Sequence, residues 1–509
     1  MTMITRLFCT TALSAFTFAS VASAQVTAND VWQNTRDAIA TLGGDFSAAK
    51  ARRGDTLSIT DMRLAFQLPF DAGSLSLTLP DFQLSENGDG TVSLTYPKTS
   101  TYNIAVVITD EGSFSGNLNL TYDTFSYIAS GNPRDVTYTY SIGKMTMDTS
   151  DIAIEGDNLP DEPIAVSMQG TVLGLSGTTR IRVGSLVAIK SDVTIKDQDF
   201  LVKADLPEAS GIEYSTTLKN QSTMAEITLP RNGMDILNLA AAFRSGLRVV
   251  GTSTIGLYET RQIDKANGEI VSDQITTVNA YNTKVEVNQS HLKVSGTTSE
   301  ATITIGKNPI VPFPIFLSVK STESAVELPF LASSKLQDFG LSMLLNDLVV
   351  PDSIMAMMDP THALPNVPAT ISIDLSGKVK NMIDWLDIET VLALDASQEM
   401  PVEMHALTLN TLLLDMLGAQ LNGSGAATFD NTDGTPRPIG TLDLSLIGGN
   451  TLLDTLVSVG LVSEEQAMGA RLAIATVTRP DPDAGEDALK SKLEINDQGH
   501  ITANGMRIK

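Results

Sequence analysis

Apolar and polar residues alternate along most of this chain, and that alternation constrains the fold more than any other feature. Successive side chains of a β-strand point to opposite faces, so a period of two predicts strands with one face on a core and one in water. Clear examples are Leu75, Leu77 and Leu79; Ile104, Val106 and Ile108; Leu118, Leu120 and Tyr122; Ile371, Ile373 and Leu375; and Leu442, Leu444 and Leu446. The sequence therefore predicts a mainly β protein.

Turn signals separate the predicted strands. Residues that tolerate positive φ, as hairpins require, occur at Asn87-Gly88-Asp89-Gly90, Asp110-Glu111-Gly112, Asn267-Gly268, Asp433-Gly434 and Asn504-Gly505. The alternation also changes phase at Asp61, which indicates a β-bulge. We expect a long antiparallel meander that forms an elongated or curled sheet.

A few short helices interrupt this pattern. Thr27 and Asp30 have capping-box spacing before a helix whose apolar face would carry Val31, Trp32, Ala38, Ile39 and Leu42, with Gly43-Gly44 at its end. Further helices are predicted from about Met234 to Arg244 and from Asn381 to Leu392. The stretch from Pro351 to Pro368 is predicted to be a loop.

A helical pair is predicted at 450–475, close to the C-terminus. Its first member runs from Asn450 to Val459, and Gly460 terminates it. Ser463 and Gln466 then form a capping box for the second member. We expect the apolar stripes of both helices to face the core.

The first 24 residues are typical of a secretory signal peptide. Arg6 precedes an apolar run, and Ala22-Ser23-Ala24 stands just before Gln25, which predicts cleavage between Ala24 and Gln25. The predicted location is the periplasm. The domain prediction is then a signal peptide at 1–24, an N-terminal β-rich half with a leading helix at 25–232, and a C-terminal β-rich half at 233–509 that contains the helical pair.

Composition excludes several classes of protein. The single cysteine, Cys9, lies in the predicted signal peptide, so the mature chain has no disulfide. The net charge of −25 disfavours partners that require basic patches, such as nucleic acid and anionic lipid surfaces. No later segment reaches about 18 uninterrupted apolar residues, so we expect no transmembrane segment in the mature chain.

The residues show no pattern typical of catalysis. The four histidines, His291, His362, His405 and His500, have no ligand spacing that would suit zinc. The sequence lacks a nucleophile elbow and a phosphate-binding glycine loop, and Asp430–Gly434 is interpreted as a hairpin turn instead of a calcium loop. We therefore predict no catalytic residue, no metal ligand and no cofactor. A carboxylate-based hydrolase is the enzymatic alternative.

Several segments resemble one family of exported proteins. They are Thr5–Leu13, Ser85–Val92, Asp374–Lys380, His405–Asn410, Gly448–Asn450, Glu464–Arg471 and Asn504–Lys509. These segments resemble the DUF2125 family, which comprises uncharacterised alphaproteobacterial exported proteins. The resemblance implies export and implies no reaction or site residue.

The C-terminal order of two short helices, a strand, a turn and a final strand resembles the ends of YdgA-like and AsmA-like envelope proteins. That resemblance implies a curved β-rich protein, and for the AsmA-like proteins a link to lipid movement or outer-membrane homeostasis. The functional hypothesis is a non-catalytic periplasmic envelope protein that binds lipid or another apolar ligand in a β-sheet groove. A structural or interaction scaffold of the cell envelope, with a protein partner, is the alternative. A contiguous apolar groove would favour the first, and a fully packed interior would exclude it.

Overall fold

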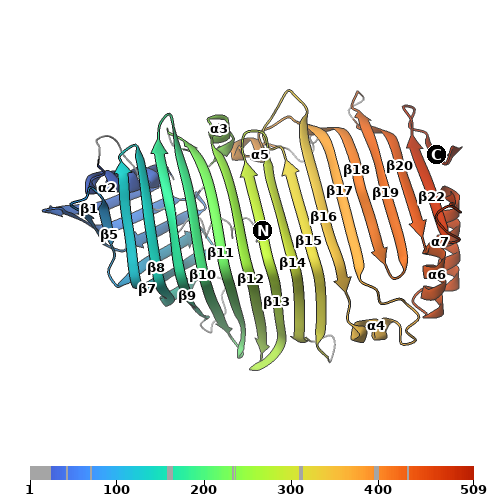
Figure 1. Cartoon of the computed structure of the whole chain (residues 1–509), viewed down its shortest axis with the longest axis horizontal. Helices are drawn as coiled ribbons and strands as arrows, with labels where there is room; N and C mark the ends of the chain where they lie inside the picture. The colour runs from blue at the N-terminus through green and yellow to red at the C-terminus, as the bar shows by residue number, and fades with distance from the viewer. Residues whose placement is uncertain are drawn as a thin grey trace. The chain divides into compact units, whose positions relative to one another are not determined.

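The computed structural model describes residues 25–41, 44–68, 71–156, 164–231, 234–235, 237–308, 313–394, 401–432 and 435–509. The predicted signal peptide, including Ala24, and the predicted turn at Asp433-Gly434 lie outside these residues. The described chain is a long antiparallel meander with 24 strands and six short helices, which confirms the predicted fold class (Figure 1). It divides into two compact units, one ending at Asp273 and one beginning at Gln274. The division into halves at 232/233 stays a prediction.

The first unit contains strands β1 to β12 and two helices. Their bounds are β1 Asp45–Arg53, β2 Thr56–Gln67, β3 Gly73–Leu79, β4 Phe82–Glu86, β5 Val92–Thr95, β6 Thr99–Ile108, β7 Gly112–Asn132, β8 Asp135–Glu155, β9 Ala165–Val183, β10 Leu186–Leu206, β11 Ser210–Pro230, β12 Arg248–Ala266, α2 Ala28–Thr41 and α3 Leu239–Arg244. Strands β7 to β12 pair antiparallel in chain order. The earlier strands branch, because β2 pairs with β4 along its first half and with β3 along its second half.

Phase changes occur inside the strands of this unit. Asp61 has a φ of 53°, and the register places Asp61 and Met62 opposite Ala48, so the predicted bulge is confirmed. Thr124 of β7 and Asn220 of β11 also have positive φ. Such residues let a long strand shift its alternation and keep apolar side chains on one face.

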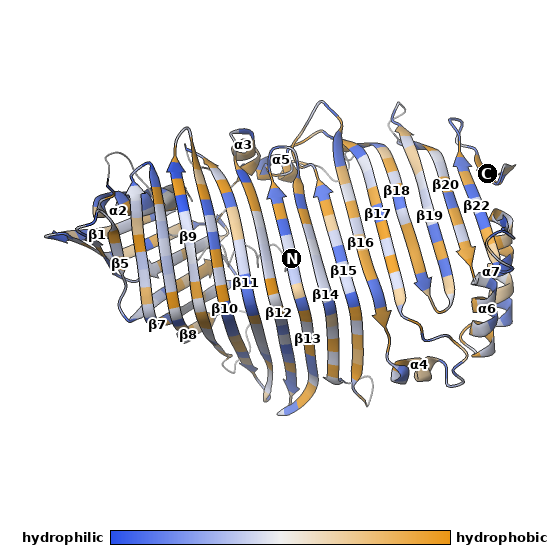
Figure 2. Cartoon of the chain, in the orientation of Figure 1, coloured by the Kyte–Doolittle hydropathy of each residue, from blue (hydrophilic) through white to orange (hydrophobic). Residues whose placement is uncertain are grey.

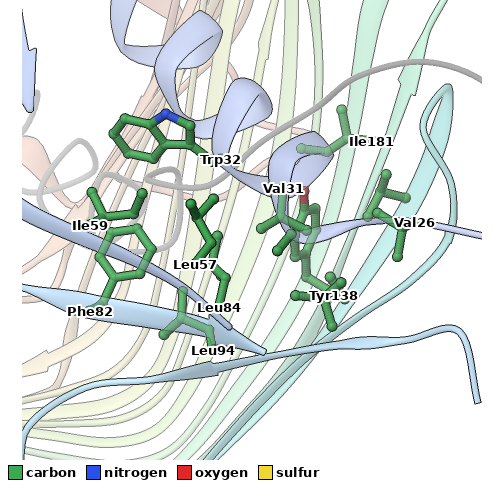
Figure 3. Packing of buried hydrophobic residues seen from close by; sticks show 14 of the residues in the cluster. Val26, Val31, Trp32, Leu57, Ile59, Phe82, Leu84, Leu94, Tyr138 and Ile181 are labelled. Carbon is green, nitrogen blue, oxygen red and sulfur yellow. The ribbon is translucent and has the colours of Figure 1, made fainter. Parts of the chain in front are cut away.

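The core of the first unit lies where α2 and the short strands cover the face of β7 to β10. The buried cluster contains Val26, Ala28, Val31, Trp32, Leu57, Ile59, Met62, Phe82, Leu84, Val92, Leu94, Ala129, Val136, Tyr138 and Ile181 (Figure 3). The predicted capping box of α2 is present, since Thr27 N donates to Asp30 Oδ2 at 2.9 Å and Asp30 N donates to Thr27 Oγ1 at 3.2 Å. Val31, Trp32 and Ile39 are buried as predicted. The side chains of Ala38 and Leu42 lie outside the described part.

Large aromatic side chains fill the space between these layers. Ring contacts run from Trp32 through Phe82, Tyr96 and Phe125 to Tyr127 and its neighbours. Tyr138 is fully buried, and its hydroxyl accepts a hydrogen bond from Asn34 Nδ2 at 3.2 Å. Burial raises the pKa of Tyr138 far above its usual value, so the ring stays neutral.

The second unit contains strands β14 to β24 and four helices. Their bounds are β14 Leu292–Lys307, β15 Ile315–Leu328, β16 Gln337–Val349, β17 Ala369–Asn381, β18 Val402–Met416, β19 Ala419–Asp430, β20 Arg437–Ile447, β21 Arg479–Pro480, β22 Ala488–Ile495, β23 Ile501–Ala503, β24 Met506–Arg507, α4 Asp352–Met358, α5 Ile388–Leu392, α6 Gly449–Ser458 and α7 Glu464–Val477. The boundary between the units falls within β13, Glu269–Val287. Strands β14 to β20 pair in chain order, and β22 pairs with β20 across the helical insertion.

The helix predictions hold where local signals are strong. Helices α6 and α7 confirm the predicted pair, and Ser463 and Gln466 form both hydrogen bonds of the capping box. The helix predicted from Met234 begins later, at Leu239, because Asn238 caps it by accepting from Ala241 N.

Two predictions near β17 were wrong. Asn381 does not begin a helix but ends β17, where it pairs with Val402 and its side chain donates to Pro329 O at 2.9 Å. Only Ile388–Leu392 is helical there, and Trp385 precedes that helix. The predicted loop after Pro351 contains a short helix, α4, whose first turn carries Asp352.

Candidate functional site

The sheet of the second unit has one strongly apolar face between β16 and β22. Residues that pair directly across antiparallel strands project to the same face. Three such rows cross the six strands β16, β17, β18, β19, β20 and β22: Leu341, Leu375, Leu409, Gly425, Leu442 and Leu493; Met343, Ile373, Leu412, Gly423, Leu444 and Ser491; and Leu345, Ile371, Leu414, Leu421, Leu446 and Leu489. Only Ser491 among them carries a polar side chain. We call these three rows the aliphatic face.

The opposite face of the same strands is mainly polar, although Leu344 and Leu413 also lie on it. It carries Ser342, Asp374, Ser376, Thr408, Asn422, Ser424, Thr441, Asp443, Ser445, Lys490, Lys492 and Glu494. Lys492 Nζ and Glu494 Oε1 form an ion pair at 2.7 Å on this side. The sheet is therefore amphipathic, and Figure 2 shows the resulting alternation of apolar and polar residues along β16 to β20.

A bulge in β18 keeps the aliphatic face continuous. Asp374 pairs with Thr411 but its neighbour Leu375 pairs with Leu409, so Asn410 is an extra residue. This insertion lets Leu409 and Leu412 remain on one face although three positions separate them. The amide of Asn410 donates to Asp374 Oδ1 at 3.1 Å on the polar side.

Glycines in β17 and β19 leave room for neighbouring apolar side chains. A Cβ on Gly423 would stand 2.8 Å from Leu444 Cδ2, so the side chain of Leu444 lies over this glycine. At the next row outward, the ring of Phe339 lies in the same way against Gly377 of the adjacent strand. The side chains of Leu444 and Phe339 therefore occupy the space that a side chain at these glycines would fill.

The aliphatic face has no second layer over it within the described chain. Every Leu, Ile and Met of the three rows is exposed or half-buried, and Leu341 and Met343 expose 44% and 46% of their surface. Ser491 is the exception, because it is buried and donates to Val477 O at the end of α7. The helical pair thus borders one edge of the face and leaves the rows open.

The carboxylate of Asp487 links the start of α6 to the chain segment that leads into β22. Asp487 accepts hydrogen bonds from Asn450 N at 3.3 Å and Thr451 N at 2.8 Å, and from the side chains of both residues. Burial alone would raise the pKa of Asp487, but these hydrogen bonds outweigh it and hold the pKa below its usual value. The start of α6 is therefore fixed beside an ionised carboxylate.

The histidines considered in the sequence do not form a common site. His291 Nδ1 lies 3.4 Å from Glu327 Oε1, and His405 Nε2 lies 3.3 Å from Glu403 Oε2. His362 is exposed. Among the described residues, no group of three or more His, Cys, Asp or Glu side chains could hold a metal ion. Gln25, the residue that directly follows the predicted cleavage site, is exposed.

Comparisons with protein families, with curated proteins and with solved structures found no match to this chain. The resemblances to DUF2125 and to AsmA-like envelope proteins therefore stay predictions. No helix in the described ranges is long and apolar enough to cross a membrane.

Alternation identified two strands of the aliphatic face, β17 at Ile371–Leu375 and β20 at Leu442–Leu446, but did not reveal that the face is open. One sequence signal could have shown it. From Gln337 to Lys509 the chain holds only three aromatic residues, Phe339, Trp385 and Phe429. A segment of this length that packs two layers together normally uses more aromatic side chains, because they supply most of the buried area per residue.

Proposed function

We propose that this protein binds the acyl chains of lipids on the aliphatic face of its second unit, as a non-catalytic protein of the periplasm. The observation that carries the proposal is the three rows of Leu, Ile and Met that no second layer covers in the described chain. These side chains offer dispersion contacts and no hydrogen bonds. A hydrocarbon chain has no hydrogen-bonding groups, so dispersion contacts alone can bind it.

The size of the face supports a ligand-binding role. Six strands about 4.8 Å apart span about 24 Å, and three rows about 7 Å apart span about 14 Å. With the side chains at its rim, the face has an area on the order of 400 Å², which is within the range of the largest apolar patches of monomeric proteins. Such patches usually mark an interaction site, because each Å² removed from water contributes about 25 cal/mol.

The carboxylates support a role without catalysis. Where a shift of an Asp or Glu pKa is resolved in the described chain, the pKa is lowered, as in Asp135 beside Arg180 and Glu403 beside Lys380. A carboxylate-based hydrolase needs one carboxyl with a raised pKa to act as the acid. The carboxylates whose shift is resolved are thus held ionised by ion pairs or hydrogen bonds, which favours binding over hydrolysis.

The proposal is tested with glutamate substitutions on the two faces of the same sheet. Leu341→Glu and Met343→Glu place a charge on the aliphatic face at side chains that are already exposed, so both variants should fold. Ser372→Glu, on the opposite face of β17, is the matched control. We expect the purified mature chain to carry bound lipid in native mass spectrometry without detergent, the two face variants to lose it, and the control to retain it.

Binding of a fluorescent fatty acid provides the second measurement. The affinity should fall at least tenfold in Leu341→Glu and stay within twofold in Ser372→Glu. An empty mature chain that also fails to bind the fatty acid would refute the proposal. In that case a stoichiometric protein partner would favour the scaffold alternative.

A further inference from the structure

Exposed arginines gather at one edge of the sheet in the first unit. Antiparallel pairing places the turn between β7 and β8, the turn between β9 and β10, and the segment from β11 to β12 at the same edge. Helix α3, in that segment, also lies there (Figure 1). The exposed arginines of these connections and of the strand ends beside them are Arg134, Arg182, Arg231, Arg244 and Arg248. We call these five residues the basic edge.

Local packing joins these segments into one surface. The N–H of Val183 donates to Arg134 O at 2.9 Å, which links the β7–β8 turn to the end of β9. A Cβ on Gly246 would stand 3.2 Å from Leu186 Cδ1, so the residues after α3 pack against the start of β10. One cross-strand row then runs through four strands from β9 to β12: Arg182, Ala188, Thr228 and Arg248. The basic edge is therefore continuous in space.

Few carboxylates balance this charge at the same edge. The segments 132–135, 182–186 and 230–248 carry five arginines and two acidic residues, Asp135 and Asp235. Asp135 is also held by Arg180, whose Nε and Nη2 donate to its two carboxylate oxygens at 2.6 and 2.5 Å. These hydrogen bonds, with the charge of Arg182 nearby, keep the pKa of Asp135 below its usual value, so it stays ionised. The edge nevertheless keeps an excess of positive charge.

The opposite edge of the same sheet is acidic. Its connections and strand ends carry eight acidic residues: Asp110, Glu111, Glu155, Asp205, Glu208, Glu213, Asp264 and Glu269. Lys203 and Lys265 also lie there, and both pair with Glu213, at 3.0 Å and 3.7 Å. Strand β11 is 21 residues long, so roughly 65 Å separates the two edges. Charges are screened over about 8 Å at physiological ionic strength, so the acidic edge does not cancel the field at the basic edge.

The basic edge has the chemistry of a phosphate-binding surface. All five of its cations are arginines, and a guanidinium binds a phosphate through two parallel hydrogen bonds. The edge crosses β8 to β12, which spans roughly 19 Å at the usual spacing of neighbouring strands. A small anion occupies a single point on such an edge, whereas a membrane surface presents phosphates along its whole length.

We infer that the basic edge docks the first unit on a membrane surface that contains anionic phospholipids. Clusters of basic residues bind such surfaces because each cation near the headgroups adds to the attraction. The net charge of −25 disfavours this partner for the chain as a whole, but only the charges close to the contact act on it. The inference uses no residue of the aliphatic face, so it does not depend on the acyl-chain proposal.

The test is co-sedimentation of the mature chain with lipid vesicles. We expect binding to vesicles of phosphatidylcholine mixed with phosphatidylglycerol, which is anionic, and little binding to vesicles of phosphatidylcholine alone. Added salt should weaken the binding, because it screens the arginines. Arg134→Gln, Arg182→Gln and Arg231→Gln, combined in one variant, should lower the affinity at least tenfold. All three side chains are exposed, so the variant should fold.

The matched control combines Lys50→Gln, Arg53→Gln and Arg63→Gln, which remove the same charge from exposed positions of β1 and β2. It should keep its affinity within twofold of the parent chain. Leu341→Glu should also bind the anionic vesicles within twofold of the parent chain, since it alters only the aliphatic face. Absence of binding to the anionic vesicles, equal binding to the neutral vesicles, or an equal loss in the control would overturn the inference. A parallel loss in Leu341→Glu would overturn it as well, because the binding would then belong to the aliphatic face.

Discussion

The two units carry the same alternation of apolar and polar residues but use it differently. In the first unit, α2 and the strands from β1 to β5 cover the face of β7 to β10, and Val136, Tyr138 and Ile181 are at most 1% exposed. In the second unit, the corresponding aliphatic rows have no covering layer within the described chain. Alternation thus specifies strands and their two faces, and it leaves open whether protein or another molecule covers the apolar one.

The covered face of the first unit and the open face of the second unit also differ in their types of side chain. The covered face uses large rings, such as Trp32 and Tyr127, that bridge two layers. The open face uses Leu and Ile with glycines between them, as at Gly423. Rings fill the space between two layers because each buries a large area. On the open face, the Leu444 side chain instead occupies the space over Gly423.

The largest expected effect is the difference in unfolding free energy between a Leu→Ala substitution in the first unit and one in the second unit. Leu84 is completely buried in the first unit, and Leu341 is 44% exposed on the aliphatic face. Leu84→Ala should lower the free energy of unfolding by about 3 kcal/mol, because it leaves a cavity, and Leu341→Ala should cost less than about 1 kcal/mol. Urea denaturation followed by tryptophan fluorescence measures both, since Trp32 reports on the first unit and Trp385 on the second. Equal costs would show that the aliphatic face is covered in solution.

A smaller loss of stability is expected when the hydrogen bonds that position α6 in the second unit are removed. Asp487→Ala removes the acceptor of four hydrogen bonds at the start of α6 and should cost about 2 kcal/mol at neutral pH. Thermal unfolding measures this cost. Asp454→Ala removes a carboxylate that is 75% exposed and should change stability by less than about 0.5 kcal/mol.

The pH dependence of the Asp487 contribution follows from its lowered pKa. The folded-state pKa lies below the unfolded value of about 3.9, so the stabilisation is complete above about pH 4 and is lost as the pH falls through the folded-state pKa. Acidification from pH 7 to pH 3 should therefore destabilise the parent chain more than Asp487→Ala. An identical loss in both would show that the carboxylate is not hydrogen-bonded in solution.

The smallest effect concerns the capping box of α7. Ser463→Ala should cost about 1 kcal/mol, because it removes the acceptor of Gln466 N. Hydrogen exchange of the first-turn amides of α7 should become faster in this variant. Ser458→Ala is the control, since the Ser458 hydroxyl donates to a carbonyl within α6 and caps no helix start. Faster exchange in both variants would assign the effect to the helical pair as a whole.

The sequence predicted those elements whose signals are local. The capping boxes at Thr27 and Ser463 and the bulge at Asp61 depend on residues a few positions apart, and all three were correct. The helix predicted at Asn381 was wrong because distant contacts override local preference there. Asn381 bonds to Pro329 O and Asp384 accepts from Ala332 N, each across 52 positions of chain.

The strand content, the turns and the two-faced character of the sheet follow from the sequence, because these depend on the periodicity of neighbouring residues. Which apolar face is covered depends on packing between distant elements. Leu84 and Leu341 both stand at apolar positions of alternating strands, yet only Leu84 has a layer over it. The reason is that covering a face requires a second element to pack against it, and α2 with its neighbouring strands does so in the first unit alone among the described residues.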